Sequence, residues 1–404
     1  MRVTSNLIYN QSALSMAKAN ERYLKVQEKI AQNTEIVRPS DDPNGAGQLL
    51  RYEADSKLMK QYENNMTLAT NSLKYESVAL ESMNTTLNSI NVLMIQSQNG
   101  AYSQDDYDTM AEEMENLLHS MADLMNSQDS NGKYIFAGTN AGSPAFIKNV
   151  DGRYQYDGDE AQRNAQIGDN ITIATNDSGK KIFEDTWTRN NFTAVTSAGS
   201  ATLSSRVADQ DAYDAFLKKN YSAVNPALNN FQLVTESPGA GQFEISDSSG
   251  VIATGNYQPG EPFTFNGMEF TLTGAAGSTV DFSFDVPTRD NVLNQVQSAI
   301  DALRNPSLSS GQREEAILDA FTSIKNTQAN MSTASSSVGA RLNTIDNRTD
   351  YGASKEIFNK EAQENIGGLN VYKATTELKL SESALEASQL LFQRLSSLSL
   401  FNSL

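Results

Sequence analysis

The chain has 404 residues, enough for two or three domains, with no cysteine and a single histidine. It therefore has no disulfide framework, no thiolate nucleophile, no cysteine-based zinc site and no pair of imidazoles for a metal. The net charge of −18 argues against a nucleic-acid or anionic-membrane surface, since both need basic patches. We expect no cofactor, no metal, and neither a nucleic-acid nor a membrane partner.

The first helix is predicted over residues 13–37, where apolar side chains recur at steps of three and four. Its stripe consists of Met16, Ala19, Tyr23, Val26 and Ile30. Arg38-Pro39 should end this helix, because the residue before proline avoids the helical region. Residues 40–43 (SDDP) then predict a new helix start, with an oxygen-bearing cap, two acids and a proline in the first turn.

A long ladder of apolar residues follows, and its spacing is typical of long helices packed along one another. It consists of Met59, Tyr62, Met66, Ala69, Leu73, Glu76, Leu80, Met83, Leu87, Ile90 and Met94, of which only Glu76 is charged. After Asn99-Gly100 the stepping resumes at Tyr107, Met110, Met114, Leu117, Met121 and Leu124. Towards the other end it recurs at Ile317, Phe321, Ile324, Gln328, Met331, Ser335, Val338, Leu342 and Ile345.

From about residue 129 the apolar period changes from 3.6 to 2, which indicates an antiparallel β domain. Strands are predicted at residues 133–137, 153–156, 170–174, 192–196, 231–235, 243–246, 251–253, 262–265, 268–273 and 279–286. One helix is expected inside this region, at residues 209–221. The helical pattern returns after Pro287, on a stripe of Val292, Val296, Ala299 and Leu303.

The order helix, β, helix predicts an α+β fold in which both chain ends form long antiparallel helical rods and an antiparallel β domain is inserted between them. We expect terminal arms at residues 1–38 and 365–404, a rod domain at 39–128 and 288–364, and an exposed β domain at 129–287. The two arms carry net charges of +3 and 0, so the rest of the chain carries −21. The arms therefore suit close packing against other protein.

The C-terminal helix is apolar on two faces, and a single neighbouring helix cannot cover both of them. One face holds Val371, Ala374, Leu378, Leu385, Phe392 and Leu395, and the other Leu380, Ala384, Ala387, Leu391 and Leu398. Leu7, Ile8, Leu14 and Leu24 likewise lie off the main N-terminal stripe. We predict that the arms are marginal alone and stable among copies of themselves. The predicted partner-binding residues are Met16, Tyr23, Ile30, Leu378, Leu385, Leu391, Phe392, Leu395 and Leu398.

Signals for catalysis or metal binding are weak, and we assign no catalytic or metal residue. Residues 127–132 (SQDSNG) resemble the start of a calcium loop, but Ser127 and Gly138 stand where such a loop needs acids. Acid pairs at 105/106, 112/113 and 157/159 could serve glycoside hydrolysis only if they faced one another. His119 lies on an amphipathic helix and is expected to be solvated.

Several segments together resemble the flagellin superfamily, and within it the hook-associated proteins that join hook to filament. They are residues 1–4 (MRVT), 37–43 (VRPSDDP), 131–138 (NGKYIFAG), 156–159 (YDGD), 179–183 (GKKIF), 337–342 (SVGARL) and 398–401 (LSLF). The resemblance covers both helical ends and the first part of the β region, whereas residues 187–286 resemble nothing in particular. The two prolines of residues 37–43 favour a junction protein over a filament protein.

The resemblance implies a structural subunit without enzymatic activity, exported through the flagellar type III apparatus without a cleaved signal peptide. The implied location is the extracellular flagellum, with arms in an inner tube, rods around it and the β domain outermost. Implied partners are copies of the chain, a hook-associated protein on the hook side, flagellin or another hook-associated protein on the filament side, and an export chaperone.

Other classes remain open from the residues alone. A flagellin-like filament subunit would share most of the pattern. An acidic-dyad glycosidase should have convergent acids in a pocket of the β domain. A secreted type III tip or translocator protein should lack the motifs at residues 38–43 and 131–138.

Overall fold

The computed structural model describes residues 2–99, 102–274 and 277–401, and the side chains of residues 2–6 and 395–401 lie outside this description. The chain folds into two compact units. One comprises residues 1–73, 164–175 and 339–404, and the other residues 74–163 and 176–338. Two long helices, α2 (Pro43–Ser97) and α6 (Ser310–Gly367), run through both units.

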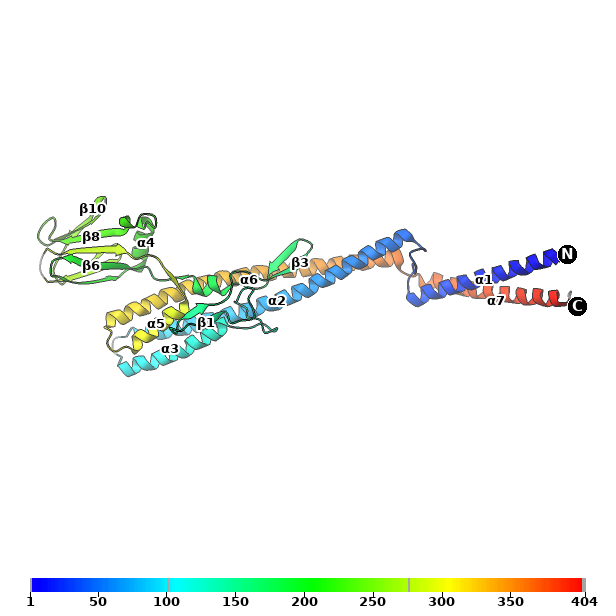
Figure 1. Ribbon diagram of the computed structural model, residues 1–404, viewed down its shortest axis with the longest axis horizontal. Helices are drawn as coiled ribbons and strands as arrows, with labels where there is room; N and C mark the ends of the chain where they lie inside the picture. The colour runs from blue at the N-terminus through cyan, green and yellow to red at the C-terminus, as the bar shows by residue number, and fades with distance from the viewer. Residues whose placement is uncertain (1, 100–101, 275–276, 402–404) are drawn as a thin grey trace. The chain divides into compact units, whose positions relative to one another are not determined.

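The first unit contains the terminal helices, parts of α2 and α6, and a β hairpin. Helices α1 (Arg2–Gln32) and α7 (Val371–Phe401) pack side by side (Figure 1). The hairpin consists of β3 (Asn164–Gly168) and β4 (Ile171–Ala174), which pair antiparallel. It is attached to α2, because Tyr62 Oη donates to Asp169 Oδ1 at 3.1 Å and Asn65 Nδ2 donates to the Gln166 carbonyl at 2.8 Å.

The predicted start and stripe of α2 are confirmed. Asp42 Oδ1 accepts from the backbone N–H groups of Asn44 and Gly45, at 3.1 and 3.0 Å, and so caps the helix that begins at Pro43. Every ladder residue from Tyr62 to Met94 is buried, and Met59 is half-buried. Most residues of the predicted stripes of α3 (Gln104–Met125) and α6 are also buried. At four positions a neighbour is buried instead: Leu118, Met125, Thr327 and Ala334 replace Leu117, Leu124, Gln328 and Ser335.

The second unit has a helical core formed by α3, α5 (Val292–Arg304) and the adjoining parts of α2 and α6. The first part of the inserted segment also belongs to this core, which includes Ile135, Phe136, Phe146, Tyr154 and Phe183. The local elements here are β1 (Phe146–Lys148), β2 (Tyr154–Tyr156) and the π-helix η1 (Lys180–Glu184).

A second hydrophobic core lies between two antiparallel sheets that we call the β sandwich, residues 192–284. The five-stranded sheet has the order β10 (Gly250–Asn256), β9 (Gln242–Asp247), β8 (Asn230–Thr235), β13 (Thr279–Phe284), β6 (Phe192–Ala198). The three-stranded sheet has the order β11 (Phe263–Phe265), β12 (Met268–Thr273), β7 (Thr202–Val207). Helix α4 (Gln210–Asn220), predicted from the sequence, adds Tyr213 and Leu217 to the core, and η2 (Pro226–Asn229) precedes β8.

The chain enters and leaves the β sandwich through β5 (Thr186–Trp187) and β14 (Arg289–Asp290), which pair antiparallel. A salt bridge and hydrogen bonds attach this entry to α6. Arg189 Nε donates to Asp319 Oδ1 at 2.7 Å, its guanidinium also pairs with Glu315, and Asn326 Nδ2 donates to the Trp187 carbonyl at 2.8 Å.

Two sequence predictions are wrong. Residues 133–137 are not a strand, because their backbone groups bond to four separated segments, at Ser127, Ala141, Asp159 and Gly179, rather than to one partner strand. Helix α1 ends at Gln32 and not near Val37. Asn33 there has a φ of 51°, a left-handed conformation that terminates helices. The predicted α+β class, with long terminal helices and a central antiparallel sheet domain, is confirmed.

Candidate assembly interface

The arm, which we define as α1 and α7, buries one face of each helix against the other. Met16, Tyr23 and Ile30 of α1 and Leu378, Leu385 and Phe392 of α7 are half-buried. Val26 and Ala374 are buried, and the rings of Tyr9 and Phe392 lie 5.0 Å apart. Six of the nine predicted partner-binding residues therefore lie on half-buried faces of the arm, and the ring contact of Tyr9 was missed because its surroundings are rich in Ser and Asn.

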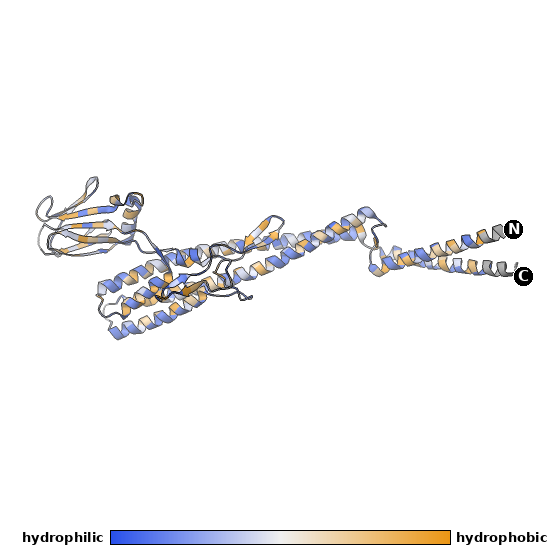
Figure 2. Cartoon of the chain, viewed as in Figure 1, coloured by the Kyte–Doolittle hydropathy of each residue, from blue (hydrophilic) through white to orange (hydrophobic). Residues whose placement is uncertain are grey.

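The outer surface of the arm carries large apolar side chains that this chain does not cover. Figure 2 shows that hydrophobic residues recur along both α1 and α7. Those at least half exposed are Leu7, Ile8, Leu14, Leu24, Val371, Tyr372, Leu380, Leu390 and Leu391. Leu391, the predicted residue of the second face, is 60% exposed. The side chains of Leu395 and Leu398 lie outside the described residues.

Covering this outer surface would be favourable. A fully buried leucine contributes about 1.5–3 kcal/mol relative to an exposed one, and these side chains are already partly covered. About 1 kcal/mol for each would still sum to a several-kcal/mol stabilisation of an assembled form. Exposed apolar side chains gathered on one pair of helices are typical of a site of protein association.

The arm is tied to the long helices by a short two-chain connection. The N–H of Glu35 donates to the Gly367 carbonyl at 2.8 Å, and Thr34 forms a bridge with Gly368. A Cβ at Gly368 would clash with the backbone carbonyl of Glu364, whereas a Cβ at Gly367 would lie 2.8 Å from the end of the Leu49 side chain. The alignment of the two crossing chains therefore favours glycine at residue 368, where the obstructing atom belongs to the backbone.

The motif at residues 37–43 forms a turn that is attached to α1. Lys25 Nζ lies 2.7 Å from Asp41 Oδ1, and this hydrogen bond lowers the pKa of the Asp41 carboxyl below its usual range. Arg38 pairs with Glu28 at 3.0 Å, and Lys29 pairs with Glu35 at 2.5 Å. The charged residues of this segment thus position the arm.

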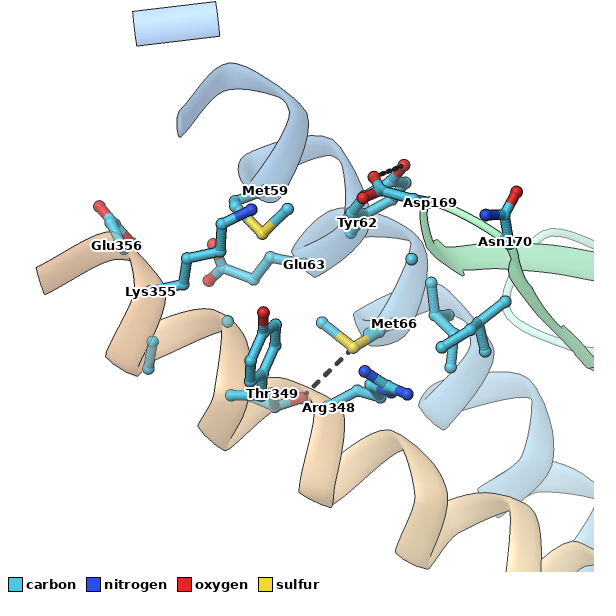
Figure 3. A pocket seen from close by; sticks show the side chains of 16 residues that line it. Met59, Tyr62, Glu63, Met66, Asp169, Asn170, Arg348, Thr349, Lys355 and Glu356 are labelled. Atoms are coloured by element: carbon cyan, nitrogen blue, oxygen red, sulfur yellow. Dashed lines mark hydrogen bonds between the residues drawn. The ribbon is translucent and has the colours of Figure 1, made fainter. Parts of the chain in front are cut away.

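A cavity of about 350 Å³ lies between α2, α6 and the β3–β4 hairpin (Figure 3). Met59, Tyr62 and Met66 face it from α2, and the Thr349 hydroxyl contacts Met66 Sδ at 3.7 Å. Beside it, Lys355 Nζ and Asn359 Nδ2 each donate to the Asp55 carboxylate at 2.8 Å. Partial burial raises the pKa of Asp55, but these hydrogen bonds more than offset it and leave the pKa lowered.

Two of the motifs that resemble the flagellin superfamily, residues 131–138 and 156–159, meet in one polar cluster inside the second unit. The Asp159 carboxylate accepts from the N–H groups of Thr139 and Asn140 at 2.9 and 3.0 Å, and Tyr156 Oη donates to the Phe136 carbonyl at 3.0 Å. Gly138 has a φ of +71°, and a Cβ there would clash with Asp159. These motif residues therefore shape the backbone. Asn176, which donates to the carbonyls of Ile135 and Gly138, was not anticipated from sequence.

The residues considered for catalysis or metal binding have local structural roles. Asp106 forms a capping box with Ser103, and hydrogen bonds from the Ser103 side chain and backbone lower its pKa. Asp129 Oδ1 accepts from the N–H groups of Asn131 and Lys133, as in a turn. His119 is exposed. Within residues 2–99, 102–274 and 277–401, no three histidine, aspartate or glutamate side chains are grouped to hold a metal ion.

In the part of the chain that the structure describes, no helix combines the length and apolar character needed to cross a membrane.

Comparison with known proteins identifies relatives of this architecture. Residues 3–141 match the bacterial flagellin N-terminal helical region. Flagellar hook-associated protein 3 of Escherichia coli is 26% identical over 268 residues, covering 62% of this chain and 83% of that protein.

Two crystal structures share the fold. FlgL of Xanthomonas campestris has a TM-score of 0.58 at 23% identity, with 78% of this chain and 99% of that chain covered. Hook-associated protein-3 of Legionella pneumophila has a TM-score of 0.59 at 22% identity, with 78% and 98% covered. The alternatives of a tip or translocator protein and of a glycosidase receive no support from these relatives. The chain belongs to the flagellin superfamily, among the structural hook-associated proteins of the hook–filament junction.

Proposed function

We propose that the chain joins hook to filament by packing its arm against the arms of neighbouring copies. The observation that carries this proposal is the outer apolar surface of the arm, in which nine large side chains are at least half exposed. Packing several copies together would bury both faces of α7 at once.

The proposed layers follow the division of the chain inferred from sequence. Residues 1–38 and 365–404 form an inner tube, residues 39–128 and 288–364 form a rod layer around it, and residues 129–287 form the outward part. The arms have a net charge near neutral, which favours close packing, whereas the strongly acidic remainder favours contact with water.

The proposed partners are copies of the chain, a hook-associated protein on the hook side, and flagellin or another hook-associated protein on the filament side. The chain is proposed to leave the cell through the flagellar type III apparatus without a cleaved signal peptide and to act without enzymatic activity. Before export a chaperone would cover α7, since an amphipathic helix laid in a groove hides its apolar face.

The test is the single substitution Leu391→Asp. It places a charge on the exposed face of α7, where the free chain should tolerate it because Leu391 is 60% exposed. In a packed tube or a chaperone groove the charge would be desolvated, at a cost of a few kcal/mol. We expect normal folding by circular dichroism, weaker co-precipitation with the chaperone, and loss from purified flagella.

The matched control is Val150→Asp, a fully exposed loop position in the second unit. It should be exported and incorporated like the parent chain. Normal chaperone binding and normal incorporation of the Leu391→Asp chain would contradict the proposal that both partners use this surface.

A further inference from the structure

The four strand edges of the β sandwich differ in what protects them from pairing with another strand. In the three-stranded sheet, β11 is only three residues long and follows Pro262, and β7 carries Arg206, which pairs with Glu269 at 2.7 Å. Short strands, proline and charge are common protections of exposed edges. The edges of the five-stranded sheet, β10 and β6, contain neither charge nor proline over seven residues each.

Both unprotected edges expose a large apolar side chain. Val251 on β10 is 55% exposed, and Ile252 beside it occupies a β-bulge. Val195 on β6 is 60% exposed. β10 and β6 lie at opposite edges of the sheet (Figure 1).

The register of the sheet aligns these two valines. Val251 is opposite Ser246, Ser246 is opposite Gln232, Gln232 is opposite Asp281, and Asp281 is opposite Val195. Residues opposite one another in a ladder share a face of the sheet. Val251 and Val195 are therefore the two ends of one row on the same face.

We propose that β10 of one copy pairs with β6 of the next copy, so that the sheet continues from sandwich to sandwich. The row would then continue across the joint, with Val251 of one copy beside Val195 of its neighbour. Four antiparallel pairings connect β10 to β6 through three intervening strands, so β10 and β6 run in the same direction. The joint between successive copies is therefore a parallel pair.

A second copy of this chain is the occupant that fits the charge of the edges. The chain has a net charge of −18, so two copies repel over most of their surface. β10 and β6 offer uncharged strands where two acidic sandwiches can meet. The inference rests on the proposed function, since a head-to-tail contact that joins opposite edges requires successive copies around a common axis.

Cysteine trapping tests the proposal, because the chain has no native cysteine. Full-length Val195→Cys and Val251→Cys chains are mixed at high concentration, oxidised, and separated without reductant. The same two chains are co-expressed, and the flagella are examined for incorporation and for the disulfide. Paired strands hold the thiols within bonding distance, so we expect about tenfold more dimer than from the control mixture of Val224→Cys and Val251→Cys. Val224 is the matched exposed valine outside the strands.

Each outcome decides the proposal. Dimer that forms in the mixture and disappears when the Val251→Cys chain also carries Ile252→Lys supports it. Dimer from Val251→Cys alone would indicate symmetric β10–β10 pairing and overturn it, as would no dimer above the control. If the chains enter flagella but never crosslink, this inference fails while the proposed function stands. If they crosslink in solution but never enter flagella, the proposed function fails and the edge contact remains.

Discussion

The arm and the helical core of the second unit carry the same spacing of apolar residues but bury it to different depths. In the core, Met83 and Ile90 are fully buried because α2, α3, α5 and α6 surround them. In the arm, Met16 and Leu385 are only half-buried because each helix has a single neighbour. The number of helices that pack against an apolar stripe therefore decides whether the stripe stabilises the monomer or an assembly.

The largest expected difference is in local opening. The stripe residues of the arm are mostly only half-buried, so the arm should unfold locally at a far lower free energy than the core. Limited proteolysis of the free chain should trim both ends towards a product near residues 39–364. Intact termini after extended digestion would show that two helices suffice to order the arm.

Truncation of one leucine in each region sharpens the comparison. Leu87→Ala removes a core side chain that is 1% exposed and should lower the free energy of unfolding by about 2–5 kcal/mol. Leu385→Ala on the arm should lower it by about 1 kcal/mol or less, yet reduce incorporation into flagella. Urea unfolding followed by circular dichroism measures both. Equal losses of stability would contradict the comparison.

The polar part of the second unit is tested by Arg189→Ala. The Arg189 side chain is 3% exposed and pairs with Asp319 and Glu315 of α6. Loss of the guanidinium leaves two partly buried acids without their cation and should lower the free energy of unfolding by about 1–3 kcal/mol. Arg189→Lys should recover only part of this, because an ammonium lacks the planar fork that serves two carboxylates. A change in the free energy of unfolding below about 0.5 kcal/mol would show that the salt bridge does not stabilise the attachment to α6.

The pair of Asp55 and Lys355 in the first unit should make a smaller, pH-dependent contribution. The pKa of Asp55 is lowered, so its contribution is present above its ordinary pKa and is lost as pH falls through the lowered value. The hydrogen bond with Asp55 raises the pKa of Lys355, so that contribution is lost as pH rises through the raised value. Asp55→Asn should lower the free energy of unfolding by about 0.5–1 kcal/mol between roughly pH 4 and 10, and by less outside this window. Urea unfolding at several pH values checks it, and a pH-independent difference would contradict it.

The smallest effect on assembly is expected from the largest deletion, the removal of the β sandwich. The β sandwich should be dispensable for assembly, as its hydrophobic core is separate from the helical core. Replacement should be limited to residues 192–284, because residues such as Phe146 and Phe183 pack in the helical core. With a short flexible linker there, the chain should still enter flagella, as judged by immunoblotting. A chain that is exported but never incorporated would contradict the proposed layers.

Periodicity was sufficient to predict the long helices, the change to short strands and the α+β class. The ladder from Tyr62 to Met94 and the cap at Asp42 are local patterns, and each is realised where the sequence indicated. The two apolar faces of α7 are also a local pattern, because an uncharged second stripe can be recognised in the sequence without knowing which partner covers it. Motif resemblance added the family, which no physical property of single residues could supply.

Only the tertiary structure decided which stripe residues are covered and by what. Residues 133–137 alternate like a strand, but backbone hydrogen bonds to four separate segments give them an irregular path. Phe146 and Phe183 lie within the β domain predicted from the sequence, yet they pack in the helical core. Likewise the alignment of Val195 with Val251 depends on strand order and register across four ladders. Such facts join residues far apart in the chain, whereas sequence periodicity reports only the near neighbours that share a helix or a strand.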